Sequence, residues 1–234
     1  MNAETVSVIV PVRNEADHLA ETLAGLRDAL QEGDELIVVD GGSTDASVDI
    51  ARQGADRVIL SAPGRARQMN AGARQARGDW LWFVHADTRL NRSHRQALAA
   101  LSAQGRWGRF DVRLSGRRIL FRVIGAMINL RSRLSGIATG DQGIFVRQDI
   151  FAALGGYPDQ PLMEDIALSR LLKRQARPCC LRPALVTSSR RWEARGAWPT
   201  IWLMWSLRGT KPLHSRDAWT LVRPRRRCRG DVGS

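Results

Sequence analysis

Residues 6–15 read Val-Ser-Val-Ile-Val-Pro-Val-Arg-Asn-Glu, a β-branched run that ends abruptly in polar residues. Its apolar character is continuous, which is typical of a strand buried on both faces. Leucines then recur every three or four residues from Leu19 to Leu30, the spacing of one helix face. We therefore expect a strand followed directly by an amphipathic helix, with Asn14 as its N-cap.

The same alternation continues through the first hundred residues. Ser43 and Asp45 stand where a cap and a first-turn acid would start the second helix. The remaining expected elements are strands at 35–39, 57–60 and 80–84 and a helix at 65–76. Strands that alternate with helices predict an α/β fold with a mostly parallel central sheet and helices on both faces.

The pattern loosens after about residue 106. We expect an Arg-rich apolar segment, a strand around 140–147, and a helix from Glu164 to about Gln175. Residues 211–234 form a basic stretch of low hydrophobicity, which we expect to be a disordered tail.

The charge balance points to an anionic partner. The 234 residues carry 36 basic and 23 acidic side chains, a net charge of +13, and Lys occurs only at Lys173 and Lys211. Guanidinium groups bind phosphate and carboxylate through two parallel hydrogen bonds, so nucleotides, lipid headgroups and nucleic acids all remain open. A hydrophobic content of 44% excludes a wholly disordered chain.

The cysteines and the apolar stretches indicate the cellular compartment and the relation to membranes. Cys179 and Cys180 are adjacent and Cys228 lies in the basic tail, so no disulfide framework or paired metal spacing is present. With no signal-peptide pattern at the start, we expect a cytoplasmic protein. The stretches 119–130 and 197–207 are shorter than the roughly 20 residues of a spanning helix. Three tryptophans make 197–207 a candidate for peripheral contact with an anionic membrane, and core packing is the alternative.

Polar residues follow the expected strands, where ligands bind in open parallel sheets. Asp40 is placed to accept hydrogen bonds from a base or ribose, and Asp87 to bind a divalent cation beside a diphosphate. Arg65 and Arg67 are placed to bind phosphate. The structural alternatives are a capped turn, a turn Asp and an exposed basic helix face.

Two acids, Glu164 and Asp165, open the last expected helix. A general base beside an acceptor hydroxyl must be a carboxylate or a His, so either acid is a candidate. Stabilisation by the helix dipole is the alternative explanation for acids at this position.

Taken in order, seven stretches resemble family 2 glycosyltransferases of bacteria, which have the GT-A fold. They are 8–15, 38–45, 69–72, 78–79, 139–143, 155–157 and 164–165. The resemblance implies a donor site formed by Pro11, Arg13, Glu15, Asp40, Gly41, Ser43, Arg65, Arg67 and Asn70. It implies acceptor or phosphate contacts from Asp141, Gln142, Arg191 and Trp192, a Mg²⁺ or Mn²⁺ ion on Asp87, and catalysis by Asp165 with Glu164 as rival.

Three departures from the family pattern stand out. The Asp-x-Asp motif reads His85-Ala86-Asp87, and Gly41 replaces the second Asp of Asp-Asp-Gly. Arg191-Trp192 matches processive relatives, but Ser188 stands in place of their Gln, so processivity is not supported. Residues 188–192 are most similar to a subgroup associated with arsenosugar biosynthesis.

The resemblance implies transfer of a sugar from a nucleoside diphosphate sugar to an acceptor hydroxyl, with inversion, the acceptor being a small molecule or lipid-linked. It implies one domain over residues 1–210, with a nucleotide-sugar half at 1–105 and an acceptor half at 106–210. A nucleotidyltransferase on a similar sheet and a basic nucleic-acid-binding protein are the alternatives; no RNA-binding motif supports the latter.

Overall fold

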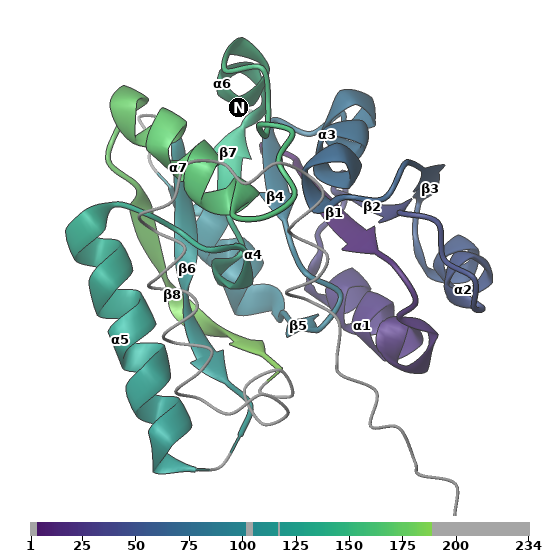
Figure 1. Cartoon of the computed structure of the whole chain (residues 1–234), viewed down its shortest axis with the longest axis horizontal. Helices are drawn as coiled ribbons and strands as arrows, with labels where there is room; N and C mark the ends of the chain where they lie inside the picture. Colours follow the sequence, from purple (N-terminus) through teal and green to yellow (C-terminus); the bar gives the residue numbers. More distant parts are fainter. Residues whose placement is uncertain (1–3, 102–104, 117, 189–234) are drawn as a thin grey trace, which may run out of the picture.

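A computed structural model describes residues 4–101, 105–116 and 118–188, and its strands form one eight-stranded sheet (Figure 1). The strand order is β3-β2-β1-β4-β7-β6-β8-β5. The strands are β1 (Val6–Val12), β2 (Glu35–Asp40), β3 (Arg57–Leu60), β4 (Trp80–Phe83), β5 (Thr88–Arg89), β6 (Trp107–Leu114), β7 (Phe145–Arg147) and β8 (Cys179–Thr187). The helices are α1 (Ala16–Ala29), α2 (Ser47–Gly54), α3 (Arg65–Gln75), α4 (Arg92–Ala99), α5 (Ile119–Ser135), α6 (Gln148–Ala153) and α7 (Glu164–Gln175), with the 3₁₀ turn η1 (Gly140–Gln142).

The sheet is mixed and mostly parallel. Strands β3, β2, β1 and β4 run parallel to one another, as do β6 and β8. Strand β7 is antiparallel to both β4 and β6 and so joins the two parallel groups, while β5 is antiparallel to β8. The expected α/β fold is confirmed, and the antiparallel β7 is the feature that strand-helix alternation does not reveal.

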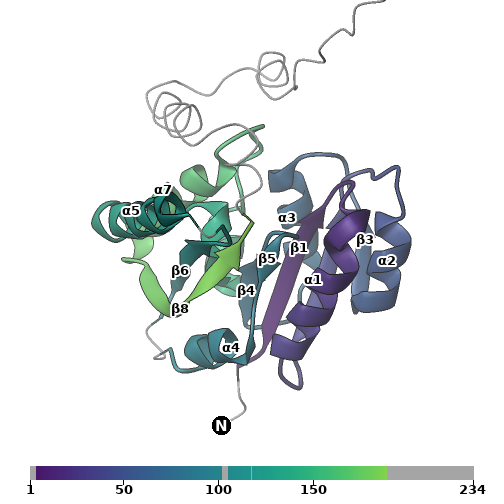
Figure 2. The same ribbon diagram turned by 90° about the horizontal axis from the view of Figure 1, so that it is seen from below.

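Helices cover both faces of the sheet, and β1 is therefore buried on both sides. Val8 and Val10 pack with α1, α2 and α4 on one face, whereas Ile9 packs with α3, α6 and α7 on the other. The remaining helix, α5, packs on β6 through a small separate core of Leu114, Phe121 and Ile124. Figure 2 shows α5 and α7 beside the β6–β8 side of the sheet.

Both expected helix caps are wrong. Helix α1 begins at Ala16 and α2 at Ser47, and neither has a side-chain cap. Asn14 adopts φ 55°, and its side chain accepts the backbone N–H of Thr44 at 2.8 Å. The hydroxyl of Ser43 accepts the backbone N–H of Asn14 at 2.9 Å. These polar groups tie the loop after β1 to the loop after β2, which a local capping rule cannot foresee.

Other elements match their expected ranges closely. The strand at 57–60 and the helix from Glu164 to Gln175 have the expected bounds. The strand expected at 140–147 is the η1 turn followed by the short β7. Residues 189–210 and the tail lie outside the described residues, so the division at residue 210 stays a prediction. Among the described helices, none has the length and apolar character needed to cross a bilayer.

Candidate active site

The loop after β2 is organised by Asp40, which is 2% exposed. One carboxylate oxygen accepts the backbone N–H groups of Gly42 and Ser43, both at 2.9 Å, and the other accepts the hydroxyl of Ser43. Gly42 has φ 83°, a left-handed conformation that glycine adopts readily. Asp40 therefore holds the glycine loop in place at the carboxyl end of β2.

Gln68 lies beneath this loop and was not foreseen from the sequence. Its buried amide donates to the backbone carbonyls of Val12 and Val39, at 2.9 and 2.8 Å. A Cβ on Gly41 would lie only 2.8 Å from the Gln68 side chain. Gly41 thus leaves the space that Gln68 fills, at the position where the family carries a second Asp.

The other expected donor residues of the first loop lie around this point. Pro11 is buried in β1, Arg13 is exposed, and Glu15 precedes α1 with its backbone N–H donated to the hydroxyl of Ser47 at 2.9 Å. Val12, between them, pairs with Asp40 in the parallel register of β1 and β2. The first-loop residues and the β2 loop therefore share one edge of the sheet.

Helix α3 connects this edge to the second half of the chain. Arg67 pairs with Asp159 at 3.0 Å, and both side chains are more than half exposed. Asn70 donates to the carbonyl of Tyr157 and accepts its N–H, both at 2.8 Å. In this structure Arg67 and Asn70 join α3 to the 155–159 loop, and their contact with a donor stays a prediction.

Asp165 occupies the start of α7 and faces the loop of η1. Its carboxylate accepts the backbone N–H of Gly140 at 2.7 Å and that of Ile166 at 2.7 Å. His85, at the carboxyl end of β4, also lies against Gly140, because a Cβ there would be 2.5 Å from its Nε2 and 3.7 Å from the Asp165 carboxylate. The His85 Nδ1 lies 3.2 Å from a carboxylate oxygen of Asp141. Three segments far apart in sequence thus meet around Gly140.

The two acids at the start of α7 both have a raised pKa, although their surroundings differ. Burial and the charge of Asp165 raise the pKa of Glu164, and Arg65 partly offsets them. Burial raises the pKa of Asp165 although two backbone N–H groups stabilise its charged form. Burial and both acids raise the pKa of Tyr157 well above 10, so this phenol stays neutral. A carboxylate whose pKa moves toward neutrality is suited to general-base catalysis.

Gln142 and Asp141 belong to the same η1 turn but differ in exposure. The Gln142 side chain is completely buried, and its oxygen accepts the backbone N–H of Thr139 at 3.1 Å. It holds the turn in this structure, while Asp141 lies beside His85 at its surface. The expected contacts from Arg191 and Trp192 lie outside the described residues, as does the expected interfacial segment 197–207.

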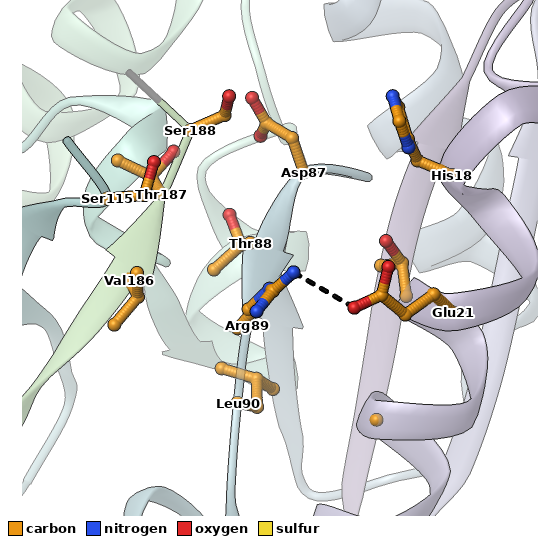
Figure 3. A pocket seen from close by; sticks show the side chains of 12 residues that line it. His18, Glu21, Asp87, Thr88, Arg89, Leu90, Ser115, Val186, Thr187 and Ser188 are labelled. Carbon is orange, nitrogen blue, oxygen red and sulfur yellow. Dashed lines mark hydrogen bonds and ion pairs between the residues drawn. The ribbon is translucent and has the colours of Figure 1, made fainter. Parts of the chain in front are cut away.

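Asp87 projects into a cavity of about 540 Å³ between α1, β5 and the end of β8 (Figure 3). His18 and Glu21 face it from α1, and Glu21 pairs with Arg89 at 2.9 Å. No group of three or more His, Cys, Asp or Glu in the described ranges forms a metal site. A single carboxylate nevertheless fits a Mg²⁺ or Mn²⁺ ion that takes its other ligands from a diphosphate and water.

Comparison with known proteins identifies the family that shares these features. The sequence profile of glycosyl transferase family 2 matches residues 7–153. The uncharacterized glycosyltransferase Rv1514c of Mycobacterium tuberculosis is 36% identical over 170 residues, which cover 67% of this chain and 63% of that protein. An undecaprenyl-phosphate 4-deoxy-4-formamido-L-arabinose transferase of Pseudomonas savastanoi is 31% identical over 160 residues, covering 61% and 46%.

A solved structure agrees with the fold. The mannosyltransferase PcManGT of Pyrobaculum calidifontis, in complex with GDP-Man and Mn²⁺, superposes with a TM-score of 0.61 and 20% identity, covering 91% of this chain and 66% of that one. The fold is therefore of the GT-A type. The chain spans less than two thirds of the length of the two curated relatives named above. Since the family profile covers more than half of the residues, the chain belongs to glycosyltransferase family 2.

Proposed function

We propose that the chain transfers a sugar from a nucleoside diphosphate sugar to an acceptor hydroxyl, with inversion at the anomeric carbon. The observation that supports this most is the position of Asp165. Two backbone N–H groups orient its carboxylate beside His85, where β4 ends, and burial raises its pKa. A held carboxylate at this edge suits a base that takes the acceptor's proton.

The reaction is a single displacement. The acceptor oxygen attacks the anomeric carbon, its proton passes to the Asp165 carboxylate, and the bond to the diphosphate oxygen breaks on the opposite face. The product bond has the inverted configuration, and the released product is a nucleoside diphosphate. Because the acceptor oxygen itself forms the new bond, no enzyme nucleophile is required.

In this proposal the nucleotide-sugar donor binds at the sheet edge formed by the loops after β1 and β2. Asp40 retains a free lone-pair direction after accepting three donors from its own loop, because a carboxylate accepts about four hydrogen bonds. Pro11, Arg13, Glu15, Gly41 and Ser43 would shape the nucleoside pocket. Arg65, Arg67 and Asn70 would face the diphosphate or the sugar.

Asp87 is the residue that would hold Mg²⁺ or Mn²⁺ together with the diphosphate. Such a cation would neutralise the charge of the leaving group. The complex of PcManGT with GDP-Man and Mn²⁺ supports this assignment by analogy. Because His85 replaces the first Asp of the family motif, Asp87 is the carboxylate of this segment. The imidazole of His85 itself lies beside Asp141.

For the acceptor we propose a hydroxyl group of a small molecule or of a lipid-linked molecule. The relative from P. savastanoi is named for transfer to undecaprenyl phosphate. Asp141, Gln142, Arg191 and Trp192 are the proposed acceptor or phosphate contacts. The association with arsenosugar biosynthesis rests on residues 188–192 and stays a prediction about pathway.

The test is incubation with a panel of nucleoside diphosphate sugars, divalent cation and extracted lipid or small-molecule acceptors. We expect release of nucleoside diphosphate and a product with inverted anomeric configuration by NMR. Release of inorganic diphosphate instead would indicate a nucleotidyltransferase, and a product with retained configuration would exclude the single displacement.

A further inference from the structure

Helix α5 presents an unusual outward surface. Of the eight large hydrophobic residues that are exposed in the described ranges, six lie on this helix. The most open are Ile119 and Leu134, with 75% and 80% of the side chain exposed. Figure 1 shows α5 lying along the edge of the fold beside β6. An exposed apolar surface gathered on one helix is a feature of interaction sites.

The exposed residues form one continuous stripe. Leu120, Val123, Met127, Leu130 and Leu134 follow one another at intervals of three and four residues. At about 100° per residue, all six exposed side chains fall within an arc of roughly 100°, opposite the inward face. The inward face carries the buried Phe121, Ile124, Gly125 and Ser132. The helix is therefore apolar on two opposite sides, and the described residues cover only one of them.

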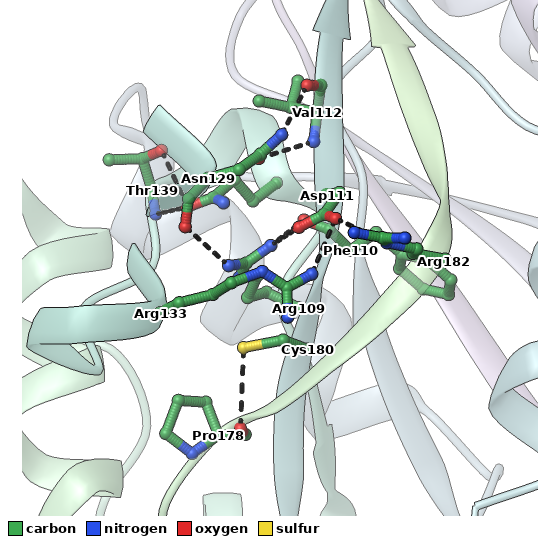
Figure 4. A network of polar contacts seen from close by, with 11 residues as sticks. Arg109, Phe110, Asp111, Val112, Asn129, Arg133, Thr139, Pro178, Cys180 and Arg182 are labelled. Carbon is green, nitrogen blue, oxygen red and sulfur yellow. Dashed lines mark hydrogen bonds and ion pairs between the residues drawn. The ribbon is translucent and has the colours of Figure 1, made fainter. Parts of the chain in front are cut away.

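Polar contacts fix which side faces outward (Figure 4). The Asn129 amide donates to the carbonyl of Val112 at 3.0 Å and accepts its N–H at 2.9 Å. Arg133 donates to the carboxylate of Asp111 at 2.7 Å, and Arg109 donates to that carboxylate and to the carbonyl of Asn129. These bonds anchor α5 to β6, so rotation of the helix cannot bury the stripe.

Charge on the borders of the stripe selects its partner. Arg122 is exposed along one border of the stripe, and Arg118 is exposed just before the first turn. No acidic residue occurs from Val112 to Gly140. A stripe of apolar side chains flanked by exposed arginine, in a segment without acids, matches an anionic lipid surface, which accepts the apolar groups below its headgroups and the guanidinium groups among them.

Two other occupants fit this charge pattern poorly. A second copy of α5 would bring arginine borders together without any acid to neutralise them. The apolar segment 197–207 of the same chain contains no acidic residue and is bordered by Arg195 and Arg208, so its sequence offers no acid to the arginines of α5. We therefore propose that the outer face of α5 docks the protein on an anionic bilayer, with the helix lying parallel to the membrane plane.

This docking face adjoins the catalytic loop. Helix α5 ends at Ser135, and Gly140, which holds Asp165, follows after only four intervening residues. Membrane docking would therefore bring the acceptor side of the candidate site near the lipid surface. The docking itself does not depend on the sugar-transfer reaction and is tested without any substrate.

The test is flotation of the full chain with vesicles of phosphatidylglycerol and phosphatidylcholine at low salt. We expect binding that is lost with pure phosphatidylcholine. Met127→Glu with Leu130→Glu should weaken binding at least about tenfold, because both side chains leave the apolar phase. Leu60→Glu is the matched control, since Leu60 is 66% exposed at the end of β3, and it should bind like the parent.

Single Arg→Gln substitutions at exposed positions test the same surface without placing a charge among its apolar side chains. Arg122→Gln should reduce binding roughly fivefold, and Arg174→Gln on α7 should leave it unchanged. Cross-linking with a photoactivatable phospholipid should then label peptides within 118–135. Unchanged binding of the α5 variants, labelling confined to residues 189–234, or a dimer in sedimentation that Leu130→Glu makes monomeric would each overturn the proposal.

Discussion

The carboxylate of Asp165 accepts the backbone N–H of Gly140 at 2.7 Å, which joins the first turn of α7 to the loop that follows α5. The same glycine also packs against His85, because a Cβ there would lie 2.5 Å from the imidazole Nε2. The end of β4, the η1 turn and α7 are therefore held in one arrangement. This arrangement orients the carboxylate before any ligand binds, which favours a positioned base.

Asp165→Asn should lower turnover by about 100-fold to 10,000-fold, the usual contribution of a general base. The amide oxygen can still accept the N–H of Gly140, and only the N–H of Ile166 loses its acceptor, so the fold and the affinity for nucleoside diphosphate should remain. Release of nucleoside diphosphate measures turnover, and calorimetry measures donor binding.

Glu164→Gln is the matched control for this substitution. Neighbouring helix residues point in different directions, so only one of the two acids is expected to face the acceptor. Full activity of Asp165→Asn combined with an inactive Glu164→Gln would assign the base to Glu164. Full activity of both variants would remove the start of α7 from catalysis.

The stability of the fold should depend on pH through Glu164. Burial and the charge of Asp165 raise its pKa from the ordinary value of 4.5, so the folded chain keeps a proton that the unfolded chain has lost. The free energy of unfolding therefore falls as pH rises from about 4.5 to the raised pKa, and stays lower above it. Glu164→Gln removes this loss and should raise Tm relative to the parent at about pH 7, with the difference vanishing near pH 4.

Thermal denaturation across this pH range is the measurement, with the exposed Glu32→Gln as the control that should leave the profile unchanged. A Tm for Glu164→Gln below that of the parent at about pH 7 would contradict the expected penalty of ionising this buried carboxyl.

The sequence predicted what depends on local pattern. The β-branched run at 57–60 and the two acids before an apolar face at 164–175 gave elements with the correct bounds. It failed where partners come from distant segments. Asn14 and Ser43 bond to each other's loops instead of capping helices, and residues 179–187 were considered only for their cysteines although they form β8.

The candidate site divides in the same way. Carboxylates at strand ends and helix starts can be recognised from spacing, because parallel strands end at one edge of the sheet. Gln68 could not be recognised, since its partners are the carbonyls of Val12 and Val39, which become neighbours only when β1 pairs with β2. The approach of His85 to Gly140 is likewise a product of the fold.

Gly41→Asp restores the second acid of the family motif and should destabilise this protein. A Cβ at this position lies 2.8 Å from Gln68, whose amide makes two buried hydrogen bonds to backbone carbonyls. Displacing that amide should cost about 1 to 3 kcal/mol in the free energy of unfolding.

Urea denaturation of Gly41→Asp, Gln68→Ala and the double variant measures this coupling. Once Gln68 is truncated the clash is gone, so the Gly41→Asp change should cost less in the Gln68→Ala background than in the parent. Strict additivity of the two free-energy changes would show that the two side chains do not compete for this space.

Asp87→Ala should weaken Mn²⁺-dependent binding of nucleoside diphosphate by at least about tenfold, because the cation loses its carboxylate ligand from the protein. His85→Ala should have a smaller effect, since the imidazole is engaged with Asp141 and Gly140. Glu21→Gln is the matched control: it lines the same cavity but pairs with Arg89, so binding should be retained. Calorimetric titration of nucleoside diphosphate with and without Mn²⁺ measures all three. Equal Mn²⁺ dependence in the parent and Asp87→Ala would exclude Asp87 as the ligand, and a loss confined to His85→Ala would move the cation to the imidazole.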